Sequence, residues 1–219
     1  MSLSDRQIER YSRQIIVPGF GARGQERLLA SRIRLVGAPD DMTPIIPYLA
    51  GAGFGAISIG VASGHLDFAN LGGLAGLNSD CSITIDSDGS ASDLAVILIG
   101  DSGSLEAARA EISSAPRRPS RPSIIVRLDH PARIAIAPAP PPCPRCIGIL
   151  DSPFAIRDSV ASVVAIAGAV EAIKLAAGIN PNIESTLITF ENYDSRSSTI
   201  STATVRSDQP CSCGSAAGR

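Results

Sequence analysis

The sequence predicts one α/β domain built on a Rossmann-like, mainly parallel sheet with flanking helices. Short β-branched runs alternate with helical segments through the first 137 residues, which is the pattern of a parallel sheet covered by helices. Of the 219 residues, 44% are hydrophobic and 18% charged, enough apolar material for one core. Near the C-terminus, residues 186–190 and 198–205 alternate in character and predict an antiparallel pair.

The elements follow in order along this single domain, residues 1–219. In the N-terminal part, residues 1–31, a helix capped by Ser4 or Asp5 breaks at Pro18-Gly19, and a second helix covers Arg23–Ala30. The Rossmann-like core is 32–137, and 138–219 holds a proline linker, cysteine pairs, a long helix and the last strands. The strands predicted in the core are Arg32–Gly37, Ala56–Val61, Ser82–Asp86, Leu94–Ile99 and Ser123–Leu128, with helical segments at Ile45–Ala52 and Ser104–Ser113.

Composition excludes several classes of protein. A net charge of −2 and a pI near 5.7 give no electrostatic reason to expect nucleic acid. The stretch Ser159–Gly178 is apolar, but Glu171 and Lys174 lie within it on one helical face and would be costly in lipid, so we expect a buried helix of small residues rather than a membrane span. Five cysteines without an export signal predict a reducing, cytoplasmic location.

Four cysteines fall in two short clusters, Cys143-Pro-Arg-Cys146 and Cys211-Ser-Cys213. Paired thiolates at such spacing are typical ligands of a tetrahedral metal, usually zinc. The second pair is one residue shorter than CxxC, so two interpretations stand: a structural zinc on all four cysteines, or metal-free clusters. The fifth, Cys81, begins a predicted strand and is interpreted as a small buried hydrophobe.

Several motifs follow one another along the chain: Glu9-Arg-Tyr-Ser-Arg13, Gly24-Gln-Glu26, a strand into Val36-Gly37, Tyr48–Gly55, Asn70-Leu71, Pro142–Ile147 and Glu171–Lys174. Their order resembles one family, the ThiF/MoeB/HesA group of ubiquitin-activating-enzyme relatives, over nearly the whole chain. This resemblance implies a nucleotide-binding domain, usually dimeric, with a structural zinc on four cysteines. It also implies binding of ATP with magnesium and adenylation of the C-terminal glycine of a ubiquitin-like or sulfur-carrier protein.

The glycine-rich turn of the family is altered. Its purpose is to bring backbone N–H groups close to phosphates, but here the GxGGxG pattern reads Gly37-Ala-Pro-Asp-Asp-Met42, and Pro39 removes a donor. Asp40 and Asp41 put carboxylates where phosphate oxygens would lie. Like charges about 4 Å apart cost about 4 kcal/mol at an effective dielectric near 20, and a millimolar ligand has only about 4 kcal/mol to lose. Either one aspartate caps the helix and closes the site, or both join Asp101 in holding magnesium.

Other positions of the family's ATP site are also changed. Ala62 and Gly64 stand where the pattern has acids, Gly73 where it has an arginine, and no lysine precedes Lys174. A catalytic cysteine is expected near Asp151 in sulfur-transferring relatives, and none is there. The remnants of the site are Gly37, Asn70 and Asp101, the last interpreted as a turn residue or as a ligand of magnesium or ribose.

Arg13 is retained. The resemblance implies that it reaches across a dimer into the partner's ATP site and acts on the phosphates in trans, as a fixed and always-charged fork. The alternative is an ordinary surface ion pair with Glu9 or Glu26.

We therefore expect a degenerate member with little or no catalysis of its own. It would act as a partner subunit or scaffold, in a homodimer or with a complete family member, for activation of a ubiquitin-like or sulfur-carrier protein. The alternatives are an active ATP-dependent adenylyltransferase with a rebuilt site and a peptide-binding module of a modification pathway.

Overall fold

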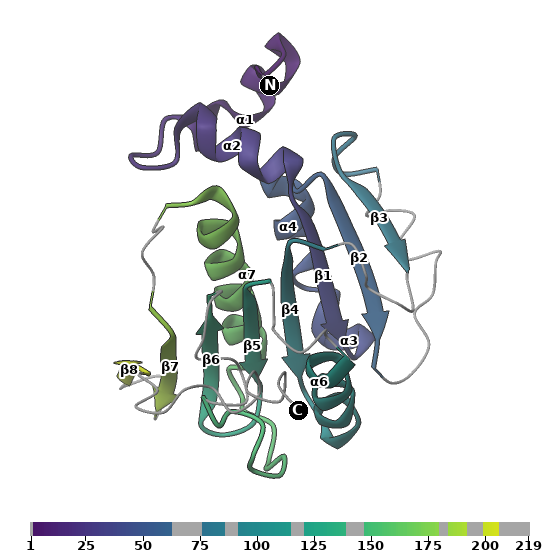
Figure 1. Ribbon diagram of the computed structural model, residues 1–219, viewed down its shortest axis with the longest axis vertical. Coiled ribbons are helices and arrows are strands. Elements are labelled where there is room, and N and C mark those ends of the chain that lie inside the picture. Colours follow the sequence, from purple (N-terminus) through teal and green to yellow (C-terminus); the bar gives the residue numbers. More distant parts are fainter. Residues whose placement is uncertain are drawn as a thin grey trace, which may run out of the picture.

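A single mixed sheet runs through the chain (Figure 1). The computed structural model describes residues 2–62, 76–85, 92–114, 121–138, 147–179, 184–191 and 199–205. The strand order is β3-β2-β1-β4-β5-β6-β7-β8, parallel from β3 to β5 and antiparallel from β5 to β8. The strands are β1 (Arg32–Gly37), β2 (Ala56–Val61), β3 (Ser82–Ile85), β4 (Leu94–Ile99), β5 (Ser123–Arg127), β6 (Ala132–Ala137), β7 (Thr186–Glu191) and β8 (Thr199–Thr204).

The predicted helices and strands of the first half are confirmed within a few residues. Helix α1 (Asp5–Ile15) starts at Ser4 with a capping box, because the Ser4 hydroxyl accepts from the Gln7 amide and the Gln7 side chain accepts from the Ser4 amide. The other helices are α2 (Gly21–Ala30), α3 (Pro39–Met42), α4 (Ile46–Ala52), α6 (Ser102–Ser114) and α7 (Ala161–Ala177).

Apolar cores lie on both faces of the sheet. Strands β4 and β5 are buried at every residue, as expected of strands covered on two sides. The larger core contains side chains of α4 and α7, and the smaller one, on the opposite face, contains side chains of α6. Gly168 lets α7 lie close to the sheet, because a Cβ there would be 2.5 Å from Val126 Cγ2.

Two expectations need correction. Strand β6 was not predicted: its alternating alanine and isoleucine residues give a weak strand signal, since alanine has little side chain to pack on a pleated surface. The antiparallel half therefore begins before the proline linker. In addition, α7 is not buried all round, because Val163 and Val170 are 49% and 44% exposed. In the described part of the chain, no helix is long and apolar enough to cross a membrane.

Strand order reverses between β1 and β4. The chain passes from β1 to β2 and β3 on one side, then returns to β4 and β5 on the other. In open α/β sheets, ligands bind outside the carboxyl ends of the strands at such a switch point. Those ends point toward α3 and α6 (Figure 1). The residues of a nucleotide site are therefore expected at the carboxyl ends of β1 and β4.

Candidate functional site

The end of β1 is closed by tight packing. A Cβ on Gly37 would lie 3.0 Å from Leu98 Cβ and 3.2 Å from the Leu98 carbonyl oxygen of β4, so this glycine serves close strand packing. Helix α3 is only four residues long, and its N-cap, Ala38, makes no side-chain cap bond. The prediction that Asp40 or Asp41 caps this helix is therefore wrong: both lie inside it, in the first turn.

Asp41 instead fills the crevice at the switch point. Its side chain is 2% exposed, and its Oδ1 lies 2.6 Å from Nη2 of Arg157 without the alignment of a hydrogen bond. Its Oδ2 lies over Gly100, immediately after β4, where a Cβ would overlap with it and lie 2.7 Å from Arg157 Nη1. A buried ion pair thus lies at the end of β1 and β4, beside the switch point where open α/β sheets bind their ligands.

Asp101 is the N-cap residue of α6. Its Oδ1 accepts from the Ser104 amide at 2.6 Å and lies 2.9 Å from the Ser104 hydroxyl, which itself accepts from the amides of Gly100 and Asp101. The Ser104 amide is the main cause that holds the pKa of Asp101 below its usual value, and the charge of Arg157 adds to it. Within the described ranges, no group of three or more His, Cys, Asp or Glu residues could hold a metal ion, so Asp40, Asp41 and Asp101 do not form the magnesium site of the alternative interpretation.

A buried ion pair follows β5 at the same edge. The Arg127 guanidinium is entirely buried and donates from Nε and Nη2 to the two oxygens of Asp129, at 2.8 and 2.5 Å. Its other donors reach the carbonyl oxygens of Ile149, Ser152 and Pro153 at 2.9–3.0 Å. Burial alone would raise the pKa of Asp129, but the bonds from Arg127 and from the Ala155 amide outweigh it and leave the pKa lowered.

This ion pair fixes the segment that carries Arg157. The Ala155 amide donates to Asp129 Oδ2 at 3.0 Å, the His130 amide donates to the Ile156 carbonyl at 2.9 Å, and Asp129 forms an antiparallel bridge with Arg157. The segment therefore crosses the carboxyl edge of the sheet and delivers Arg157 to Asp41. Sequence reasoning missed these residues, although a charged Arg-Leu-Asp at the end of a buried strand is a signal that could have found them.

Of the remaining predicted site residues, the two that the structure describes do not join this crevice. Arg13 is exposed on α1, beyond the amino ends of the parallel strands (Figure 1), and in the described part of the chain it pairs with neither Glu9 nor Glu26. Cys81 is a buried free thiol whose pKa is raised to about 11 by burial, as expected of a structural cysteine. Asn70 and the four clustered cysteines Cys143, Cys146, Cys211 and Cys213 lie outside the described residues.

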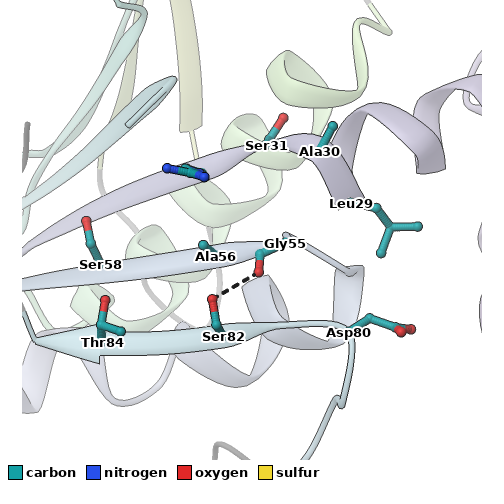
Figure 2. A pocket seen from close by; sticks show the side chains of 10 residues that line it. Leu29, Ala30, Ser31, Gly55, Ala56, Ser58, Asp80, Ser82 and Thr84 are labelled. Carbon is teal, nitrogen blue, oxygen red and sulfur yellow. Dashed lines mark hydrogen bonds between the residues drawn. The ribbon is translucent and has the colours of Figure 1, made fainter. Parts of the chain in front are cut away.

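A hollow of about 500 Å³ opens at the amino ends of β1–β3 (Figure 2). Its lining is polar and includes Arg32, Ser58, Ser82, Thr84 and Asp80. The Ser82 hydroxyl is already used, since it donates to the Gly55 carbonyl at 3.2 Å. This hollow lies at the amino ends of the parallel strands, whereas Asp41 and the switch point lie at their carboxyl ends. We therefore assign the hollow no part in nucleotide binding.

Comparisons with known proteins find similar sequences over part of the chain. No protein-family model matches the chain. A stretch of 71 residues, 32% of the chain, is 48% identical to the adenylyltransferase and sulfurtransferase uba4 of Ogataea parapolymorpha, over 18% of that protein. A stretch of 59 residues, 27% of the chain, is 46% identical to the SAMP-activating enzyme E1 of Haloferax volcanii, over 22% of it. The matched stretches thus span less than a quarter of these relatives.

Solved structures match over a much larger share. The structure of E. coli MccB with ATP covers 94% of the chain and aligns with a TM-score of 0.67 at 17% identity, over 73% of the MccB chain. The structure of PaaA covers 92% of the chain with a TM-score of 0.64 at 15% identity, over 84% of PaaA. These likenesses establish the fold, a Rossmann-like mixed sheet with antiparallel C-terminal strands.

Proposed function

We propose that this chain, which belongs to the ThiF/MoeB/HesA family of ubiquitin-activating-enzyme relatives, is a non-catalytic partner subunit or scaffold for activation of a ubiquitin-like or sulfur-carrier protein. The observation that carries the proposal is the Asp41–Arg157 ion pair over Gly100, which fills the crevice at the switch point. ATP with magnesium does not fit the residues present there. Freeing the space requires moving a buried carboxylate away from its only cation in the described part of the chain.

The outer surface of the chain supports a dimer. Val163 and Val170 lie seven residues apart, about two helical turns, on the outward face of α7, and Tyr48 on α4 is 51% exposed. Large exposed apolar side chains on two helices that pack together favour a protein interface. We infer a homodimer or a heterodimer with a complete family member through this face.

In such a dimer, Arg13 would act on the partner subunit. Its guanidinium is exposed, has no ion pair in the described ranges and lies at the edge away from its own crevice. A guanidinium is planar and always charged, so in this position it is suited to bind phosphates held by another subunit. The chain would thus supply Arg13 to a partner that binds ATP, while its own crevice stays closed.

An active adenylyltransferase is the second candidate. It is favoured by the names of the relatives, which include a sulfurtransferase-linked adenylyltransferase and a SAMP-activating enzyme, and by Arg157, which is 44% exposed and held by one ion pair. Rotation of Arg157 would free a cation for phosphate at this edge. Under either candidate we propose a cytoplasmic protein whose four clustered cysteines hold a structural zinc, because four thiolates are a donor set that suits zinc.

The test is a reconstitution with a complete family member. Both proteins are co-expressed, and the complex is assayed for carrier-dependent exchange of pyrophosphate into ATP. Arg13→Ala is expected to lower the exchange rate at least tenfold without dissociating the complex, and Arg23→Ala, on exposed α2 surface, is the matched control. Failure to form a complex, or an unchanged rate with Arg13→Ala, would contradict the proposed role.

A further inference from the structure

Four residues lie side by side across the antiparallel half of the sheet, on the face that also carries α6. Arg127 of β5 faces Arg133 of β6, which faces Thr189 of β7, which faces Ser201 of β8. Their exposure rises along this row: Arg127 is buried, Arg133 and Thr189 are half-buried, and Ser201 is exposed. The carbonyl oxygens of 149–153 cover the Arg127 end and leave the other end open.

Arg133 has no counter-charge in this row. Its Nε is buried without a hydrogen-bond partner, and no carboxylate of the described residues forms an ion pair with it. Asp129, the nearby acid, is held in a bidentate contact by Arg127. Burial, and then the charge of Arg127, lower the pKa of Arg133, while Asp129 opposes this only in part.

Such an arrangement is costly unless something completes it. Like charges directly opposite on neighbouring strands are destabilising, and buried N–H groups almost always find an acceptor. Here Arg127 is fully satisfied and Arg133 is not. The group that this position lacks is therefore a negatively charged oxygen acceptor.

We propose that Arg133 anchors a carboxylate of a partner peptide that lies across the open face of β7 and β8. A guanidinium binds a carboxylate with two parallel bonds, and the terminal nitrogens of the half-buried Arg133, unlike its Nε, are not among the buried atoms and can donate them. The peptide is favoured over a small anion because β8 is the margin of the sheet (Figure 1) and all six of its residues are exposed. Leu187 and Ala203, in the adjoining row of the same face, add apolar contact. This anchor would act with or without nucleotide in the crevice.

The experiment follows the Arg133 Nε–Hε resonance of the full chain by ¹⁵N NMR, assigned by its loss in Arg133→Gln. The probes are Ac-Ala-Glu-Ala-NH₂ and its glutamine analogue, and Ac-Ala-Ala-Ala with a free or an amidated C-terminus. A saturable shift with either carboxylate peptide and with neither neutral one is expected, at roughly millimolar affinity for a single anchor. The pair that responds distinguishes a side-chain from a terminal carboxylate. If neither carboxylate peptide shifts the resonance, the anchor is refuted.

A stability measurement tests the remaining alternative, which is that Arg133 already has a partner within the chain. Without its counter-charge, Arg133→Gln is expected to leave the urea midpoint unchanged or to raise it, because the repulsion from Arg127 is removed. Arg23→Gln, an exposed arginine on α2, is the control. A midpoint that falls well below that of the control would show that Arg133 is already paired within the chain and would overturn the proposal.

Discussion

Replacing Asp129 by alanine tests the buried ion pair that organises the carboxyl edge. The substitution removes both bonds to Arg127 and the acceptor of the Ala155 amide, and it leaves a guanidinium with no solvent exposure uncompensated. Hydrogen bonds to charged groups contribute about 1.5–3 kcal/mol each, and removing one partner of a buried pair costs about 3–5 kcal/mol. Against a typical total of about 5–15 kcal/mol, we expect Asp129→Ala to lose about 3–5 kcal/mol of unfolding free energy.

Urea unfolding followed by circular dichroism measures this loss. With a slope of about 2 kcal/mol/M, the midpoint falls by roughly 2 M. Glu106→Ala is the matched control, because Glu106 and Arg109 lie 2.6 Å apart but are 70% and 39% exposed, and a surface pair contributes about 0–1 kcal/mol. Asp129→Asn keeps one acceptor and is expected to fall between the two. A loss below about 1 kcal/mol for Asp129→Ala would refute the reasoning, since the edge would then be held by other contacts.

Three further outcomes are expected. Gly100→Ala places a methyl group inside the carboxylate of Asp41 and is expected to cost about 1–3 kcal/mol; an unchanged melting temperature would contradict the packing. Cys81 is expected to resist iodoacetamide at pH 7.5 until the chain is unfolded, because its pKa of about 11 leaves little thiolate; peptide mapping that finds equal labelling in folded and unfolded protein would contradict this. The Ser104 amide holds the pKa of Asp101 below its usual value of about 3.9, and for Asp158 burial is outweighed by its contact with His130, whose Nδ1 lies 2.9 Å from Asp158 Oδ2, so its pKa is lowered too. The contribution of both carboxylates to stability is therefore present above that usual value and is lost as the pH falls through their folded pKa values. Urea midpoints from pH 7 to 2 measure it, and a midpoint that stays constant below pH 4 would disprove it.

Local sequence signals were enough for most of the parallel half of the sheet. Runs such as Leu94–Ile99 are apolar and bounded by turn residues, so their type and limits follow from the sequence. The Ser4 cap follows from a short-range pattern in the same way. Strand β6 could not be predicted in this way, because alanine contributes almost nothing to a hydrophobic pattern.

The candidate site shows where such reasoning ends. The sequence placed Asp41 near the crevice but assigned it to a helix cap, because its partner Arg157 lies far along the chain and only the tertiary fold brings them together. Arg127 belongs to a strand that the sequence predicts, but its role depends on Asp129 and on the carbonyl oxygens around it, which only the fold brings to it. Long-range pairs between charged residues leave no periodic pattern, so they could not be predicted from one sequence.

Calorimetric titration of the purified chain with ATP and magnesium is the most direct test of a closed crevice. Because Asp41 and Arg157 form an ion pair at the switch point, where open α/β sheets bind their ligands, we expect no binding heat up to millimolar ATP, and the same result for Asp101→Ala. Micromolar binding that is lost in Asp101→Ala would contradict a closed crevice and show that the chain binds nucleotide.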